Sequence, residues 1–153
     1  MTGPHVAVCG PGSATDEEER WAEEVGRRLA EAGAVLLCGG LGGVMDAAAR
    51  GASRAGGTVV GILPGDDRFG ASEHLTVAVP TGMGEARNAI IARAADAVIA
   101  VGGEWGTLSE IALARKMGTP VVGLRTWDLG RPQDIIDART PEDAVERALD
   151  LVR

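Results

Sequence analysis

Residues 96–110 read DAVIAVGGEWGTLSE, and the order of residue types along this stretch is typical of an α/β protein. We predict a strand over 96–101, because a short, almost wholly apolar run is typical of a strand buried on both faces of a parallel sheet. Glycines follow immediately, and a helical pattern begins at Thr107. A strand, a glycine-rich turn and a helix in succession form the repeating unit of a parallel sheet covered by helices.

The same unit recurs along the chain. Further short apolar runs predict strands at 6–9, 34–38, 58–63, 75–79 and 120–124. Helices are predicted at 15–32, 44–55, 85–95, 107–117 and 140–152. Strands that alternate with helices indicate a parallel sheet with right-handed crossovers. We therefore expect a single Rossmann-like, doubly wound α/β domain over residues 1–153.

The composition argues against several classes of protein. The net charge is −7 and no basic run occurs, so we expect no nucleic-acid partner. No apolar run approaches the ~20 residues of a membrane helix, and the first residues do not read as a secretion signal, so we expect a cytoplasmic protein without membrane contact. Cys9 and Cys38 stand outside any CxxC or Cys/His pattern, so we expect buried, reduced thiols and no metal site.

Glycine is concentrated in four turns that follow predicted strands, at 10–12, 39–43, 82–84 and 102–106. In a parallel sheet these turns lie at the carboxyl edge, where open α/β sheets bind ligands at the point of strand-order reversal. In the strand order 3-2-1-4-5-6, the first and fourth strands flank that point. Glycine allows close approach of the backbone, and helix amino ends supply unpaired N–H groups. The turns therefore predict a phosphate site; the alternative is that the glycines only turn the chain.

Two common phosphate-binding motifs are absent. Residues 10–15 read GPGSAT instead of the dinucleotide fingerprint GxGxxG, and Cys38-Gly39 stands where an NAD site places an acidic residue. No turn ends in the GK[ST] of a P-loop. NAD binding and ordinary ATPase chemistry are therefore disfavoured.

Residues 80–110, PTGMGEARNAIIARAADAVIAVGGEWGTLSE, resemble the LOG-like Rossmann (SLOG) superfamily, historically described as lysine decarboxylase-like. LOG enzymes cleave cytokinin nucleoside monophosphates to the free base and ribose 5-phosphate, and they carry an Arg-Lys pair followed by PGGxGTxxE. Arg87 matches the arginine, and residues 38–52, CGGLGGVMDAAARGA, resemble the second-loop motif. The second motif is matched by Gly102, Gly103, Gly106, Thr107 and Glu110. The resemblance implies a nucleotide-binding domain.

At three positions the sequence departs from the LOG pattern, and these features resemble a smaller branch of the superfamily. Asn88 replaces the lysine of the LOG pattern, Glu85 replaces a histidine and Val101 replaces the proline. That branch includes the molybdenum cofactor carrier proteins, which hold a pterin phosphate without transforming it. The resemblance thus implies a protein that binds a nucleoside monophosphate or the molybdenum cofactor. The alternatives are a phosphoribohydrolase acting on nucleoside 5′-monophosphates, which needs no cofactor, and an interaction module without a small ligand. Lysine decarboxylation is not expected.

The motifs define a set of candidate ligand-binding residues. They are Gly10, Ser13, Gly40, Gly42, Gly43, Thr81, Gly82, Arg87, Asn88, Gly102, Gly103, Gly106, Thr107 and Glu110. In an enzyme, Arg87 would hold the phosphate and Glu110 would assist glycosidic cleavage. Each has a structural alternative. Thr107 and Glu110 have the spacing of a capping box, Ser13 could cap a helix, Asn88 could be a surface amide, and Arg87 could be solvated or paired with Glu110.

Trp105 stands inside the glycine turn 102–106, where it could stack on a ligand ring or lie in a subunit interface. The chain has three tryptophans, one phenylalanine and no tyrosine, so a tryptophan in such a turn is notable. Together with the family resemblance, the tryptophans lead us to expect a homodimer or a higher homo-oligomer.

Overall fold

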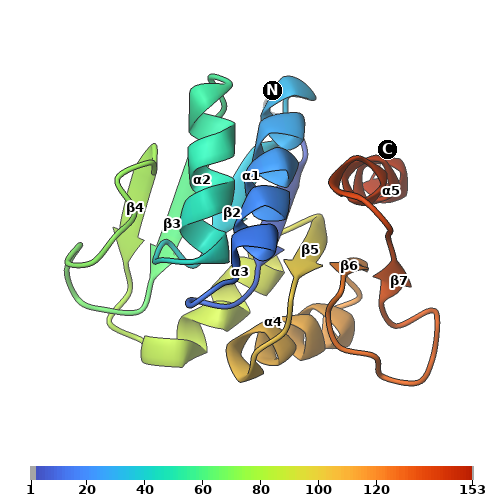
Figure 1. Cartoon of the computed structure of the whole chain (residues 1–153). Coiled ribbons are helices and arrows are strands. Elements are labelled where there is room, and N and C mark those ends of the chain that lie inside the picture. Colours follow the sequence, from blue (N-terminus) through green and yellow to red (C-terminus); the bar gives the residue numbers. More distant parts are fainter. Residues whose placement is uncertain (1–2, 153) are drawn as a thin grey trace.

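The computed structural model describes residues 3–152, which form one α/β domain around a seven-stranded sheet (Figure 1). The strand order is β4-β3-β2-β1-β5-β6-β7, and every neighbouring pair is parallel. The strands are β1 (His5–Cys9), β2 (Val35–Cys38), β3 (Val59–Leu63), β4 (Val77–Pro80), β5 (Ala97–Val101), β6 (Val121–Leu124) and β7 (Ile136–Asp137). The predicted α/β fold class is confirmed.

Helices cover both faces of the sheet (Figure 1). One face packs against α1 (Asp16–Glu31), α2 (Val44–Arg54) and α5 (Pro141–Val152). The other face packs against α3 (Asn88–Ala94), which follows the short 3-10 turn η1 (Gly84–Arg87), and against α4 (Trp105–Lys116). None of the helices formed by residues 3–152 is long and apolar enough to cross a membrane.

The central strand β1 shows why the strands read as unbroken apolar runs. Val6 and Val8 pack in the cluster beneath α1, α2 and α5, whereas Ala7 and Cys9 pack in the cluster on the α3 and α4 side. Successive side chains of a strand point to opposite faces, so a strand covered on both sides needs apolar residues at every position.

The predicted strand order is wrong for the fourth strand. β4 pairs with β3 at the edge of the sheet, and β5 is the strand that lies beside β1. The reason lies in the loop 64–76, which returns the chain to the amino edge of the sheet without forming a helix. β4 therefore starts directly beside β3. Two hydrogen bonds hold this start: Val59 N donates to Thr76 Oγ1 at 2.9 Å, and Thr76 N donates to Val59 O at 2.8 Å. The chain then reaches β5 through η1 and α3.

The structure adds a strand that the sequence pattern did not reveal. β7 contains two residues, and Ile136 pairs with Val122 of β6. A two-residue strand is too short to show an alternating pattern in the sequence. It is recognised only by its pairing with β6.

Candidate functional site

The turns after β1, β2 and β5 meet at one point of the carboxyl edge. β1 and β5 are neighbours, but the helices that follow them, α1 and α4, cover opposite faces, which makes this the point of strand-order reversal. Val44 N at the start of α2 donates to Pro11 O at 3.0 Å, which ties the second turn to the first. Three of the four glycine-rich turns are therefore brought together.

The fourth glycine-rich turn lies apart from the other three. Thr81 and Gly82 follow β4, which is three strands from β1 and hence about 14 Å away at the usual strand spacing. Their hydrogen bonds go to the segment after β3: Thr81 Oγ1 donates to Leu63 O at 2.7 Å, and Gly82 N donates to Gly65 O at 2.8 Å.

The glycines at the meeting point differ in what surrounds them. A Cβ on Gly10 would collide with Val101 O, so close packing of β1 against the end of β5 already requires glycine there. A Cβ on Gly42 would meet only Gly12 O within 4 Å, at 3.5 Å, and one on Gly106 would meet only Glu85 Oε2, at 4.0 Å. Gly42 and Gly106, together with Gly12, whose Cβ would meet only Met45 Cε at 3.9 Å, are therefore positions at which a ligand could take the place of a side chain.

Backbone conformation explains three further glycines of the motifs. Gly40, Gly43 and Gly102 have φ values of 77°, 62° and 70°. Side chains disfavour this left-handed region, so these turns require glycine with or without a ligand. Ser13 is exposed in the first turn, and the residue that caps α1 is Thr15, so Ser13 is not the helix cap.

Arg87 and Asn88 are buried beneath the meeting point. The Arg87 side chain reaches from η1 to two neighbouring segments, donating from Nε to Ile62 O at 2.9 Å and from Nη2 to Gly39 O at 3.5 Å. Its Nη1 donates to Asn88 Oδ1 at 2.6 Å and lies 3.6 Å from Glu85 Oε2. The structural alternatives of a solvated arginine and a surface amide are therefore wrong. The two carbonyl acceptors could not be found from the sequence, because the crossover connections decide that the end of β3 and the turn after β2 lie beside Arg87.

Thr107 and Glu110 do not form the capping box that their spacing suggested. α4 starts at Trp105 with Glu104 as its N-cap, so Thr107 lies within the first turn and Glu110 in the next. Both are buried, at 2% and 8% exposure, and neither Thr107 Oγ1 nor Glu110 Oε2 has a hydrogen-bond partner. Over residues 3–152 only two other buried side-chain atoms share this condition, Arg115 Nε and Thr126 Oγ1. Because buried polar groups are nearly always paired, two such atoms in one motif indicate a missing partner.

Burial sets the charge of this region. It raises the pKa of Glu110 to about 8, against the lowering effect of the Arg87 charge, and the Glu85 charge adds to the rise. Glu110 is therefore mostly protonated at neutral pH and can donate a hydrogen bond. Burial also raises the pKa of Cys9, with a contribution from Glu110, and raises the pKa of Cys38 to about 12. Both cysteines are free and buried, as expected.

Two of the helices that start at glycine-rich turns, α2 and α4, lack side-chain caps. Neither Gly43 at the start of α2 nor Glu104 at the start of α4 makes a side-chain cap hydrogen bond. In contrast, α1 has a complete capping box, in which Glu18 N donates to Thr15 Oγ1 at 3.1 Å and Thr15 N donates to Glu18 Oε1 at 2.9 Å. First-turn N–H groups without a side-chain acceptor are suited to an anion.

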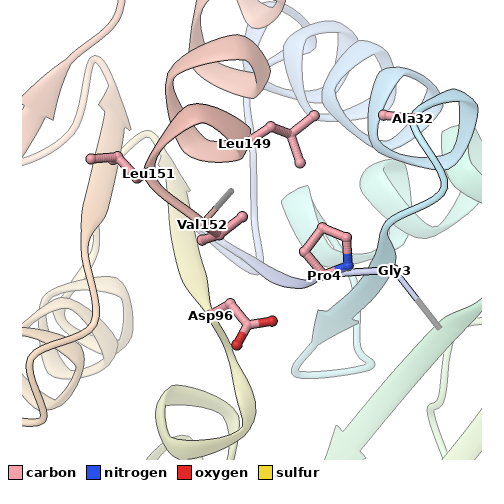
Figure 2. A pocket seen from close by; sticks show the side chains of 7 residues that line it. All are labelled: Gly3, Pro4, Ala32, Asp96, Leu149, Leu151 and Val152. Atoms are coloured by element: carbon pink, nitrogen blue, oxygen red, sulfur yellow. The ribbon is translucent and has the colours of Figure 1, made fainter. Parts of the chain in front are cut away.

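Two hollows lie near the ends of the sheet. A hollow of about 450 Å³ follows β6 at the carboxyl edge and is lined by loop residues that include Thr126 and Trp127. A larger one, of about 560 Å³, is lined by Gly3, Pro4, Ala32, Asp96, Leu149, Leu151 and Val152 (Figure 2). Within residues 3–152 no group of three or more His, Cys, Asp and Glu side chains could hold a metal ion.

Comparison with protein families gives a match to the SLOG cluster4 family over residues 3–149. The chain belongs to this family. Its structure is similar to the molybdenum cofactor binding protein of Rippkaea orientalis, with 37% identity, a TM-score of 0.94 and coverage of 100% of this chain and 99% of that chain.

Two further proteins are similar to this SLOG cluster4 member. The molybdenum cofactor carrier protein of Chlamydomonas reinhardtii is 35% identical, with a TM-score of 0.89 and coverage of 97% of this chain and 98% of that chain. An uncharacterized protein of Archaeoglobus fulgidus is 44% identical over 144 residues, which is 92% of this chain and 91% of that protein. The resemblance to the branch with molybdenum cofactor carriers is thereby confirmed.

Proposed function

We propose that this SLOG cluster4 protein binds a phosphorylated nucleotide-like or pterin ligand in the manner of a carrier. The observation that carries the proposal is the pair of buried, unpartnered atoms, Thr107 Oγ1 and Glu110 Oε2, at the point of strand-order reversal. The full-length similarity to molybdenum cofactor binding and carrier proteins supports it. A nucleoside monophosphate and the molybdenum cofactor share a phosphate and a flat ring, and either would be cargo.

The phosphate is proposed to lie over the start of α4. Gly106 leaves open space there, and the first-turn N–H groups have no side-chain acceptor. Thr107 Oγ1 supplies a further donor, and the protonated Glu110 carboxyl adds no negative charge at neutral pH. Arg87 lies behind this surface and holds the turn after β2 through Gly39 O. An anion is thus offered donors and the Arg87 charge, which the exposed Glu85 carboxylate, 3.6 Å from Arg87 Nη1, partly offsets.

A second candidate function is hydrolysis of nucleoside 5′-monophosphates at the glycosidic bond. It is favoured by the raised pKa of Glu110, since a carboxyl that keeps its proton at neutral pH can donate it to a departing base. The same protonated group is poorly suited to stabilise positive charge that develops on the sugar. For this reason we place binding without turnover first.

Mass spectrometry of the small molecules released when the purified protein is denatured would test the proposal. Calorimetry with AMP, GMP, CMP and a pterin monophosphate would follow, with chromatography to detect free base. We expect binding of at least one ligand and no free base from any nucleotide. If base is released, the hydrolase is correct, and Glu110→Gln should then lose about 100-fold in rate with little change in affinity. Failure of every ligand to bind would contradict both functions.

A further inference from the structure

Trp105 and Trp127 lie together beside the proposed phosphate site. Trp105 is the first residue of α4 and is 74% exposed. This exposure is unusual, because tryptophan side chains are highly buried on average. Its ring centroid lies 5.2 Å from that of Trp127, with the planes tilted by 37°. Trp127 is partly buried against the apolar cluster on the α3 and α4 side, and the exposed Trp105 ring beside it offers a flat, polarisable surface to solvent.

The backbone of the glycine-rich turn holds this aromatic pair in place. Trp127 Nε1 donates to the carbonyl oxygen of Glu104, the N-cap of α4, at 3.1 Å. A Cβ on Gly103 would lie 3.1 Å from Trp127 Nε1 and 3.2 Å from Trp127 Cδ1, so the absence of a side chain allows the ring to approach this closely. Gly103 thus links the phosphate-binding turn to the aromatic surface.

Each tryptophan has an unpartnered threonine hydroxyl near it in the chain. Thr107 lies two residues after Trp105, on the buried side of α4, and Thr126 directly precedes Trp127; the Oγ1 atoms of both threonines are buried and unpartnered. Thr126 and Trp127 also line the hollow of about 450 Å³ after β6. This hollow is within the size range of small-ligand sites, and Trp127 both lines it and lies against the Trp105 ring.

We propose that Trp105 and Trp127 form the surface on which the flat heteroaromatic ring of the ligand stacks while its phosphate occupies the start of α4. The inference rests on the proposed function and names the part of the ligand that the glycine-rich turns do not recognise. The partner that the unpaired threonine hydroxyls lack would then be a phosphate oxygen at Thr107 and a polar ring edge at Thr126.

Ligands with and without the ring separate this inference from the proposed function. We would titrate the full chain with AMP, GMP and a pterin monophosphate, and with ribose 5-phosphate, which matches the two nucleotides but lacks the heteroaromatic ring. At least one ring ligand should bind about 5- to 150-fold more tightly than ribose 5-phosphate, the range for stacking of one base. Binding of that ligand should quench the tryptophan fluorescence, and ribose 5-phosphate should quench much less.

Three variants identify the residue responsible. Trp105→Ala should reduce the affinity for the ring ligand to that for ribose 5-phosphate without changing the latter. Trp105→Phe should keep most of the affinity, because a benzene ring still stacks. Trp21→Phe should leave both affinities unchanged, since the Trp21 ring contacts Arg125 with 4.7 Å between Cζ and the ring centroid.

Two results would overturn the inference and leave the proposed function standing. One is equal binding of ribose 5-phosphate and every ring ligand. The other is unchanged ring-ligand affinity in Trp105→Ala; if light scattering then also shows loss of an oligomer, Trp105 contacts a second copy of the chain. If neither ribose 5-phosphate nor any ring ligand binds, the proposed function fails and the inference fails with it.

Discussion

The amino edge and the carboxyl edge of the sheet differ in the volume of their hollows and in whether their polar side chains have hydrogen-bond partners. The hollow at the amino edge is the larger, at about 560 Å³, and Asp96 is the one charged side chain among its lining residues (Figure 2). This side chain already has a partner, because Asp96 Oδ2 accepts a hydrogen bond from His5 N at 2.8 Å. At the carboxyl edge Thr107 and Glu110 are buried without partners. A hollow whose one charged side chain already has a partner offers a ligand fewer groups to bind, so the unpaired atoms of Thr107 and Glu110 identify the site better than the volume does.

The largest expected effect concerns the charge buried at the carboxyl edge. The pKa of Glu110 is about 8 in the folded chain and has a reference value of 4.5, so the folded state binds more protons between these values. Stability is therefore lost as pH rises from about 4.5 to about 8, and Glu110→Gln should remove this loss. The free energy of unfolding of Glu110→Gln should exceed that of the wild type by on the order of 5 kcal/mol at pH 9, and by much less at pH 4.

Urea denaturation of both proteins without ligand, at several pH values, would measure this difference. Subtraction of the two curves removes the titration of all other groups, since Arg87 and Glu85 remain in both proteins. A difference that does not change between pH 4 and pH 9 would show that Glu110 is ionised and solvated, and the contrast between the two edges would lose its electrostatic basis.

A second prediction tests the open space at the carboxyl edge. Gly106→Val should weaken binding of the ligand identified by mass spectrometry by about 100-fold, because the side chain would occupy the space proposed for the phosphate. Folding should be retained, since a Cβ there meets no protein atom closer than 4.0 Å. Ser109→Val places the same side chain at an exposed position of α4 and should bind normally.

Leu151→Ser serves as the control at the opposite edge. Leu151 lines the larger hollow and is 46% exposed, so the change should affect neither folding nor binding. Calorimetric titration of the three variants would check this. A loss of binding in Leu151→Ser with normal binding in Gly106→Val would move the site to the amino edge.

The smallest effects compare two threonines that have the same spacing to a glutamate. Thr15→Ala should lower the free energy of unfolding by about 1 kcal/mol, because it removes the cap of α1. Thr107→Val should instead raise it by about 1 kcal/mol, because a buried hydroxyl without a partner is replaced by a methyl group. Thermal unfolding of both variants would measure the contrast. If Thr107→Val lowers the free energy of unfolding as much as Thr15→Ala does, Thr107 caps its helix after all.

Local features of the fold were predictable to within a few residues. The strand predicted at 120–124 is β6, Val121–Leu124, and the helix predicted at 15–32 is α1, Asp16–Glu31. The prediction was less accurate where the chain departs from regular geometry. The helix expected at 85–95 begins as the 3-10 turn η1, and α4 begins two residues before Thr107, which is why the TxxE pattern was misread as a cap.

The sequence alone therefore established the α/β class, the glycine-rich turns and the motif at 102–110, because apolar periodicity and turn chemistry act over a few neighbouring residues. Only the tertiary structure settled the strand order, the burial of Arg87 and the lack of partners at Thr107 and Glu110. Whether a polar atom is paired depends on segments far apart in the chain. Here the crossover through η1 and α3 brings Arg87 to carbonyls that follow β2 and end β3, and no local pattern encodes that meeting.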